Sequence, residues 1–391
     1  MNKVRLILDY ARCGVKLCII KIISCFVKPE IYPEWIISER GDDARDNGYV
    51  FYEYIRKYHP EIKVAYIIKS DSADFSKVNS IGNTIEYGSF KHYMALVKAK
   101  YLVSSHIMGF TPNPGFFVML DKKINYLKFI VPGKKVFLQH GIIKDYIKGL
   151  CYPTTKVDVF ICGAKPEFEY ILNNYNYPKG VVNYTGLARY DKLLPYTEHK
   201  QILVMPTWRK WLNSYSIDEF KKSDYYLKYQ SLINNEKLNK VLIEYGYTLV
   251  FYPHYEMQKF LPTFSAPESV RLASIKDYDV QKLLKESELL ITDYSSVYFD
   301  MAYMNKPIVF YQFDQEHFFA EHYQRGYFDE SAFGIVTGYE DIVVNTVIKH
   351  IKKMLDNTQY KIKEKEFFTY RDDENCKRIF NVIIDNNTTD K

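Results

Sequence analysis

Short apolar runs alternate with longer amphipathic stretches along most of the chain. The runs are nearly continuous in Val, Ile, Leu and Phe, which is typical of strands that are covered on both faces of a parallel sheet. The stretches between them have helical spacing, and this alternation predicts an α/β fold. The predicted strands are 34–38, 64–69, 101–106, 135–140, 157–163, 181–186, 202–207, 248–254, 289–293 and 307–311. The clearest predicted helices are 47–58, 165–174, 217–244 and 278–288.

A polar segment at residues 192–201, which contains a proline, separates the first six predicted strands from the last four. A chain of 391 residues is long enough for about two or three domains. We therefore predict a boundary at this segment, with domains at 31–195 and 196–391 that follow an N-terminal helical segment at 1–30.

The N-terminal segment is apolar over residues 14–28 but is interrupted by Lys21 and is too short to span a bilayer. As a helix it places Leu17, Ile20 and Phe26 on a broad apolar face. Two interpretations remain open: a helix that lies on an anionic membrane surface, or an ordinary amphipathic helix that packs on its own domain. The basic residues along the segment are Arg5, Arg12, Lys16, Lys21 and Lys28.

Composition adds few constraints. Apolar residues make up 47% of the chain and charged residues 26%, as in ordinary globular proteins. The net charge of +6 is small and spread out, so we expect no nucleic-acid partner. The six cysteines form no CxxC pair, and nothing in the sequence demands a metal ion or a cofactor. The sequence contains no P-loop, dinucleotide, zinc-protease or serine-hydrolase motif.

Five of the predicted strands end in residues that are suited to chemistry. In open α/β sheets the ligand lies outside the carboxyl ends of the strands, so these ends are expected to converge on one crevice. They are Ser105-His106, His140-Gly141, Thr207-Trp208-Arg209, Pro253-His254 and Asp293-Tyr294-Ser295-Ser296.

The last of these ends predicts a phosphate site. A helix that begins near Ser295 presents free backbone N–H groups, and the hydroxyl groups of Ser295 and Ser296 add donors for a phosphate or diphosphate. Asp300, further along, either binds a ribose hydroxyl or holds the loop. The alternative is that the serines only cap the helix.

Two histidines and one arginine are further candidates. His140 at a strand end suits a general base, and the alternative is a buried histidine bonded to a backbone carbonyl. His254 either donates to a phosphate, protonates a leaving group or caps the next helix. Arg209, beside Thr207, either grips phosphate oxygens with its guanidinium or belongs to a solvated basic turn.

The acceptor side is less clearly marked. The charged loop after the first strand contains Arg45 and Asp46 and is either solvated or part of an acceptor site. Lys144 is placed on the same acceptor side. Arg189 and Asp191 are predicted to pair with each other across a turn.

The motifs HGIIKD, GLARYD, PTWR, PHY and above all ITDYSSVYFDMAYMNKPIVFY, in this order, resemble the CDP-glycerol glycerophosphotransferase family. Enzymes of this family build teichoic-acid and related capsule polymers, and the resemblance covers roughly residues 35 to 335. It implies two Rossmann-like domains that face each other across a cleft, the GT-B arrangement, and a peripheral enzyme on the cytoplasmic face of the cell membrane. By this resemblance His140 corresponds to the base. His254, Arg209, Ser295 and Ser296 correspond to the nucleotide diphosphate site.

The implied reaction is attack of an acceptor hydroxyl, deprotonated by His140, on the β-phosphorus of CDP-glycerol, with release of CMP. The expected partners are therefore CDP-glycerol, a polyol-phosphate or saccharide acceptor that is either lipid-linked or free, and an anionic membrane surface. The sequence leaves two alternatives open: transfer from CDP-ribitol, and a GT-B glycosyltransferase that uses a nucleotide sugar.

Overall fold

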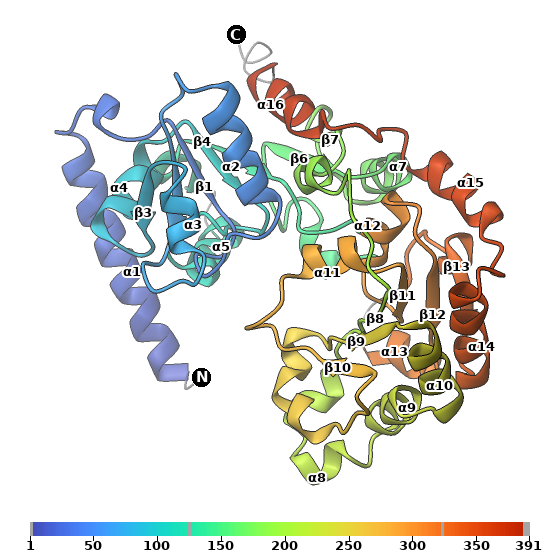
Figure 1. The fold of residues 1–391 in the computed structure, drawn as a ribbon. Helices are drawn as coiled ribbons and strands as arrows, with labels where there is room; N and C mark the ends of the chain where they lie inside the picture. The colour runs from blue at the N-terminus through green and yellow to red at the C-terminus, as the bar shows by residue number, and fades with distance from the viewer. Residues whose placement is uncertain (1–2, 124–126, 322–323, 386–391) are drawn as a thin grey trace. The chain divides into compact units, whose positions relative to one another are not determined.

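Two parallel sheets form the framework of the protein (Figure 1). The computed structural model describes residues 3–123, 127–321 and 324–385. The chain divides into two units. Unit 1 comprises Met1–Ile142, Lys148–Lys192 and Asp372–Lys391, and unit 2 comprises Ile143–Ile147 and Leu193–Arg371. The division after Lys192 lies close to the expected boundary at 195. Two segments are assigned differently from the expected domains: residues 143–147 belong to unit 2, and the C-terminal segment from Asp372 belongs to unit 1.

Unit 1 contains a sheet of seven parallel strands in the order β3-β2-β1-β4-β5-β6-β7. Alternate residues of β1 face opposite sides: Trp35 and Ile37 pack with α2 and α16, and Ile36 packs with α1, α4 and α5. Both faces are covered, which explains the continuous apolar strands. The strands are β1 (Trp35–Ser38), β2 (Val64–Ile68), β3 (Thr84–Glu86), β4 (Tyr101–Ser104), β5 (Lys134–Phe137), β6 (Val159–Cys162) and β7 (Val182–Tyr184). The α-helices are α1 (Lys3–Ser24), α2 (Asn47–Tyr58), α3 (Phe75–Asn79), α4 (Phe90–Lys98), α5 (Pro114–Lys123), α6 (Leu127–Ile130), α7 (Lys165–Asn174) and α16 (Asn375–Asp385), and the 3₁₀ turns are η1 (Pro29–Ile31), η2 (Lys148–Leu150) and η3 (Ala188–Lys192).

Unit 2 contains a sheet of six parallel strands in the order β10-β9-β8-β11-β12-β13. Ile202 and Val204 of its central strand pack with α9, α10 and α14 on one face. The strands are β8 (Gln201–Val204), β9 (Thr248–Phe251), β10 (Val270–Leu272), β11 (Leu289–Thr292), β12 (Ile308–Tyr311) and β13 (Gly334–Thr337). The α-helices are α8 (Ile217–Phe220), α9 (Asp224–Ile233), α10 (Glu236–Tyr245), α11 (Val280–Glu286), α12 (Tyr298–Tyr303), α13 (Gln315–Glu321), α14 (Glu340–Ile351) and α15 (Thr358–Phe367), and the 3₁₀ turns are η4 (Lys210–Ser214), η5 (Tyr255–Thr263) and η6 (Glu330–Ala332).

Each sheet reverses its strand order once. In unit 1 the chain winds outward from β1 through β2 to β3 and then returns to β4 on the other side of β1, and in unit 2 β11 returns in the same way beside β8. This order is that of the doubly wound α/β fold, in which ligands bind outside the carboxyl ends of the strands at the switch point. The switch points therefore lie beyond β1 and β4 in unit 1 and beyond β8 and β11 in unit 2.

The structure confirms all ten predicted strands and the predicted α/β class. The sequence missed β3, β10 and β13, which are three or four residues long and lie at sheet edges, so their side chains are only partly buried and give a weak apolar signal. The single helix predicted over 217–244 is three helices, because Ser223 and Asn235 each cap a new one.

Helix α1 has one packed side and one exposed side. Cys13, Leu17 and Ile20 are buried in the core that contains α4 and α5. Phe26, which follows the helix, is 86% exposed, so Leu17 and Ile20 do not share a face with it, contrary to the prediction. A second apolar row, called the outer stripe here, is more than half exposed at each position and consists of Val4, Ile7, Leu8, Val15, Ile19 and Ile22. No helix in the described part of the chain is both long enough and apolar enough to cross a membrane.

Candidate functional site

Two histidines meet at the carboxyl edge of the unit 1 sheet. His106 follows β4 and His140 follows β5, and the two strands are neighbours. Their ring centroids are 4.8 Å apart and the rings are nearly parallel, with an angle of 9° between them. The topology therefore stacks two imidazoles beside the switch point of unit 1.

Both imidazoles are held in the uncharged form. Burial of the imidazole lowers the pKa of His140 to about 4, the positive charges of Arg189 and Arg40 lower it further, and a hydrogen bond with the Ser105 backbone opposes this shift. The residue as a whole is nevertheless exposed to solvent. Burial also lowers the pKa of His106 to about 2, with His140 and Arg40 as further causes. A neutral imidazole accepts a proton, as a general base must.

Backbone contacts fix the chain at His140. Gln139 has a positive φ of 62°, and its carbonyl accepts a hydrogen bond of 2.7 Å from Nδ2 of Asn47. Nη1 of Arg189 donates to the carbonyl oxygen of His140 and to Asp46, both at 2.9 Å. Side chains from α2 and η3 therefore hold the segment that carries the histidine.

The predicted pair between Arg189 and Asp191 does not form. Asp191 instead accepts hydrogen bonds from the backbone N–H groups of Asn375 at 2.9 Å and Cys376 at 2.8 Å. These N–H groups belong to the first turn of α16, where no intrahelical acceptor exists. Asp191 is thus a cap for the C-terminal helix, which is far away in sequence.

The residues predicted for an acceptor site in the loop after β1 have structural contacts. The buried carboxylate of Glu39 accepts hydrogen bonds from the backbone N–H groups of Arg45 at 2.9 Å, Asp46 at 2.8 Å and Tyr49 at 3.0 Å. Nε of Arg45 donates to Asp74 at 2.7 Å, and Asp46 caps α2. Burial raises the pKa of Glu39 to about 8, and Asp46 adds to this rise. The loop is therefore anchored rather than solvated.

Lys144 is buried in unit 2, not on the acceptor side of unit 1. Its Nζ lies 2.7 Å from Asp145 and 3.1 Å from Glu330. Lys144 and Glu330 expose only 5% and 3% of their side chains. Both acids are within ion-pair distance of this ammonium group, so its charge is compensated within the protein.

The acid in the motif DYSS organises the switch point of unit 2. Asp293 is fully buried. Its Oδ1 accepts the backbone N–H of Thr207 at 2.8 Å and of Tyr294 at 2.6 Å, and its Oδ2 accepts the hydroxyl of Tyr229 at 3.1 Å. One carboxylate thereby ties the end of β8 to the end of β11.

Arg209 completes this buried cluster and is not available as a phosphate ligand. Its Nε and Nη2 donate to the two oxygens of Asp314 at 2.7 and 3.0 Å, and Nη2 lies 2.9 Å from Oδ2 of Asp293. Nη1 donates to the carbonyl of Thr207 at 2.8 Å, and no part of the side chain is exposed. Burial by itself would lower the pKa of Arg209, but the two carboxylates raise it well above its ordinary value. Four of the five N–H groups are thus already bonded.

Uncommitted donors lie beside this cluster. Oγ1 of Thr207 is buried without a hydrogen-bond partner in the part of the chain that the structure describes. The backbone N–H groups of Ser295 and Ser296 and the hydroxyl of Ser296 likewise have no partner among the described residues. Both serines are partly exposed, and the serine hydroxyl of Ser295 accepts only a long contact of 3.5 Å from Val297. Helix α12 begins at Tyr298, three residues later than predicted.

His254 and Asp300 differ in their accessibility. His254 is partly exposed, caps η5 and accepts the N–H of Glu256 on Nδ1 at 3.3 Å, so in the neutral ring the proton is on Nε2. Asp300 exposes only 3% of its surface inside α12. Of the two interpretations of Asp300, the buried position favours the structural one.

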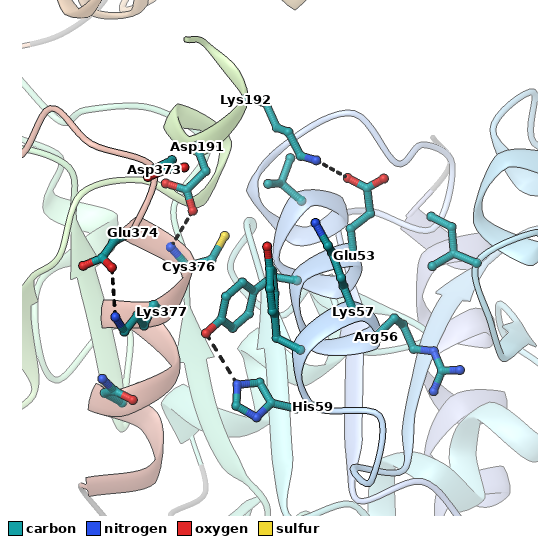
Figure 2. A pocket seen from close by; sticks show the side chains of 15 residues that line it. Glu53, Arg56, Lys57, His59, Asp191, Lys192, Asp373, Glu374, Cys376 and Lys377 are labelled. Atoms are coloured by element: carbon teal, nitrogen blue, oxygen red, sulfur yellow. Dashed lines mark hydrogen bonds and ion pairs between the residues drawn. The ribbon is translucent and has the colours of Figure 1, made fainter. Parts of the chain in front are cut away.

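A cavity in unit 1 with a volume of about 930 Å³ lies beside α2, η3 and α16 (Figure 2). Figure 2 shows Lys192 directed toward Glu53, 3.4 Å away, and Lys377 paired with Glu374 at 2.8 Å. Its charges are largely neutralised by such pairs, and none of the predicted site residues lines it. A cavity of about 480 Å³ in unit 2 borders the Arg209 cluster and is lined by residues that include Trp211, Tyr215, Asp314 and His317.

The model of the CDP-Glycerol:Poly(glycerophosphate) glycerophosphotransferase family matches residues 26–385 of this chain. The chain belongs to this family. Among its curated relatives, the minor teichoic acid biosynthesis protein GgaB of Bacillus subtilis (strain 168) is 32% identical over 380 residues, covering 92% of this chain and 41% of GgaB. The teichoic acid poly(glycerol phosphate) polymerase of Staphylococcus epidermidis is 26% identical over 315 residues, covering 73% of this chain and 41% of that protein. The chain thus spans about two fifths of the length of these relatives.

A structure of the wall teichoic acid polymerase TagF covers the whole of this chain with a TM-score of 0.67 and 17% identity, which shows the same fold. The predicted family is therefore confirmed, and the fold is α/β with two parallel sheets.

Three residues of these clusters are not among the site residues predicted from the sequence. His106 stands at a predicted strand end, and its position after the strand next to His140 is a usable signal. Asp293 lies in the motif DYSS, which by itself does not indicate that this residue links two strands. Asp314 follows β12 in a sequence with no distinctive pattern, and only the fold shows that it holds Arg209.

Proposed function

We propose that this protein transfers glycerol phosphate from CDP-glycerol to a hydroxyl group of an acceptor and releases CMP. The observation that carries the proposal is family membership over residues 26–385, combined with the neutral His140 at the carboxyl edge of unit 1. Two further facts support the donor: a relative is a teichoic acid poly(glycerol phosphate) polymerase, and one TagF structure of the same fold was solved after a soak with CDPG.

In the proposed reaction the acceptor hydroxyl gives its proton to the imidazole of His140. The oxygen attacks the β-phosphorus of CDP-glycerol, and the bond from this phosphorus to the bridging oxygen breaks. CMP leaves with the bonding electrons, and the proton on His140 passes to solvent afterwards. The negative charge that develops on the leaving phosphate needs hydrogen-bond donors.

The proposed diphosphate contacts are the uncommitted donors of unit 2. The backbone N–H groups of Ser295 and Ser296, the hydroxyl of Ser296 and Oγ1 of Thr207 are free to bond phosphate oxygens. His254 donates from Nε2 to the leaving phosphate. Arg209 acts on the diphosphate only indirectly, because it fixes the strand ends that carry these groups.

The test is release of CMP from CDP-glycerol by the full chain in the presence of a glycerol-phosphate oligomer. His140→Ala is expected to lower kcat by about 10²–10⁴-fold, the contribution of a general base, while calorimetric binding of CDP-glycerol persists. His199→Ala changes an exposed histidine of unit 2 and serves as the matched control.

Three outcomes would contradict parts of this proposal. If His140→Ala keeps more than about a tenth of the activity, His140 is not the base. Faster turnover of CDP-ribitol would change the polyol. Release of UDP from UDP-sugars, without CMP release, would make the protein a glycosyltransferase.

We further propose that the outer stripe of α1 binds an anionic membrane surface. Apolar side chains such as Val15, at 62%, and Ile22, at 64% exposed, form a row on the side away from the packed face. The helical period places Arg5 and Arg12, both exposed, on one flank of this row. An apolar row with cationic flanks matches anionic headgroups above an acyl layer.

Substitution of the stripe tests this contact without disturbing the packed face. Val15→Gln, Ile19→Gln and Ile22→Gln together should lower affinity for anionic vesicles by at least about 100-fold, because burial of one such side chain contributes about 1.5–3 kcal/mol. The matched control replaces exposed apolar residues of unit 2 with glutamine, and these are Leu227, Ile243 and Ile362. Equal vesicle binding by both triple variants would contradict the proposal.

A further inference from the structure

We propose that His106 is a positioning residue for the transfer reaction, whose ring orients His140 by stacking against it and keeps that imidazole ready to accept a proton. This inference rests on the proposed function, in which His140 is the base. It assigns a role to the second histidine of the pair, which contacts the ring of His140.

Within the part of the chain that the structure describes, no carboxylate acts on the ring of His140. The charged groups that act on it are cations: Arg189 from η3 and Arg40 from the loop after β1. The acids of that loop are engaged elsewhere, since Asp46 is bonded to Arg189 and Asp43 to Arg40. A carboxylate usually fixes the ring of a catalytic histidine and stabilises its charge. Here a hydrogen bond with the backbone of Ser105 and the flat face of His106, 4.8 Å away and nearly parallel, together take over the first task only.

His106 itself is held rigidly. Its backbone N–H donates to Oγ of Ser104 at 3.1 Å, and its Nδ1 lies 3.1 Å from Oγ of Ser105. Oγ of Ser104 in turn donates to the carbonyl of Glu39 at 3.1 Å, which ties the segment to the end of β1. A Cβ on Gly109 would lie 2.0 Å from the carbonyl oxygen of Glu39. Only glycine therefore lets the loop after His106 pack this closely against the end of β1.

Stacking also has an electrostatic consequence. Two imidazolium ions in contact would repel each other, and the charge of His140 is one cause of the lowered pKa of His106. Burial and the two arginines act in the same direction on His140. The base is therefore expected to remain unprotonated well below neutral pH, and the acid limb of the activity profile should lie near the pKa of about 4.

Two variants separate orientation from simple packing. His106→Phe keeps a flat ring that excludes water but cannot be protonated, so it should retain most of kcat and an acid limb close to that of the wild type. His106→Ala removes the ring, and kcat should fall about 10–100-fold, since small misplacement of a reacting group has effects of this size. Because more water then reaches the ring of His140, its titration should move upward toward the ordinary value of about 6.5.

The experiment is an NMR titration of the His140 ring in the full chain, assigned by comparison with His140→Ala, together with kcat and KM against pH for each variant. A wild-type midpoint near 6.5, or a folded His106→Ala protein with the wild-type midpoint and kcat, would overturn the inference. His106→Asn, which keeps a polar group but no ring, replaces the alanine variant if that protein does not fold. Failure of the proposed function is distinguishable, because it would appear as an active His140→Ala protein whatever His106 does.

Discussion

Replacement of Arg209 by methionine should destabilise unit 2 strongly and affect the donor site only through the fold. The guanidinium is fully buried and bonded to Asp293, Asp314 and the carbonyl of Thr207. Methionine fills similar apolar space against the surrounding aromatic rings but leaves both carboxylates without their cation. The perturbation therefore removes one partner of a buried ion network and leaves the others in place.

The magnitude follows from this geometry. Removal of one partner from a buried ion pair typically costs about 3–5 kcal/mol, because the remaining charge is desolvated and unpaired. For a unit of this size each kcal/mol lowers the melting temperature by about 2–4 °C, so a decrease of about 6–20 °C is expected. Arg209→Met combined with Asp293→Asn and Asp314→Asn should recover part of this loss, because no buried charge then remains unpaired.

Intrinsic fluorescence is a suitable assay, because Trp208 and Trp211 flank Arg209 in unit 2 and the third tryptophan, Trp35, lies in unit 1. Arg271→Met alters an exposed arginine of the same unit and should change stability by less than about 0.5 kcal/mol. Calorimetric titration with CDP, well below both melting temperatures, measures the donor site in each variant. If Arg209→Met melted like Arg271→Met yet bound CDP at least tenfold more weakly, Arg209 would be a phosphate ligand and the structural reasoning would be refuted.

Three further predictions concern other groups of the site. Ser295→Ala with Ser296→Ala should weaken CDP binding by about one to two orders of magnitude, which corresponds to charge-assisted hydrogen bonds, while cytidine binding is unchanged. If calorimetry showed equal losses for both ligands, the two serines would have only a structural role. Lys144→Met should lower the free energy of unfolding by about 3–5 kcal/mol in thermal unfolding. A raised KM for the acceptor at unchanged stability would instead show that Lys144 binds the acceptor. Asp191→Ala should speed amide hydrogen exchange in α16, since two of its first N–H groups lose their acceptor, and unaltered exchange near Asn375 would disprove the capping role.

The sequence predicted much of the fold because the relevant signals are local. A strand covered on both faces must be apolar at every position, so β1, β4, β5, β8 and β11 were visible as continuous runs. The edge strands β3 and β10 gave no such run, since one side of each is only partly buried. The polar residues that follow the central strands lie at the carboxyl edges of two separate sheets, because parallel strands bring their carboxyl ends to one edge of each sheet. Their role as one site stays a prediction.

The site could be predicted only as a set of candidates. Sequence spacing shows that Arg209, Lys144 and Arg45 follow strands or loops near the expected carboxyl edge of a sheet. It does not show whether each of these cations is already paired with a carboxylate. Their partners are distant in sequence: Asp314 lies 105 residues beyond Arg209, and Asp74 lies 29 residues beyond Arg45. Long-range pairs of this kind leave no periodic pattern, so a cation committed to the fold and a cation free for substrate look alike in the sequence.

The sequence by itself thus determined the α/β class, the family and the strand ends at which chemistry is expected, because burial of apolar strands and short motifs are properties of neighbouring residues. Only the tertiary structure decided which of those polar groups remain available. It bonded Arg209 and Lys144 to buried acids and stacked His106 on His140. It also left the N–H groups of Ser295 and Ser296 without partners among the described residues. The physical reason is that a buried charge must be paired within the protein, and the pairing depends on which distant segments the folded sheets bring together.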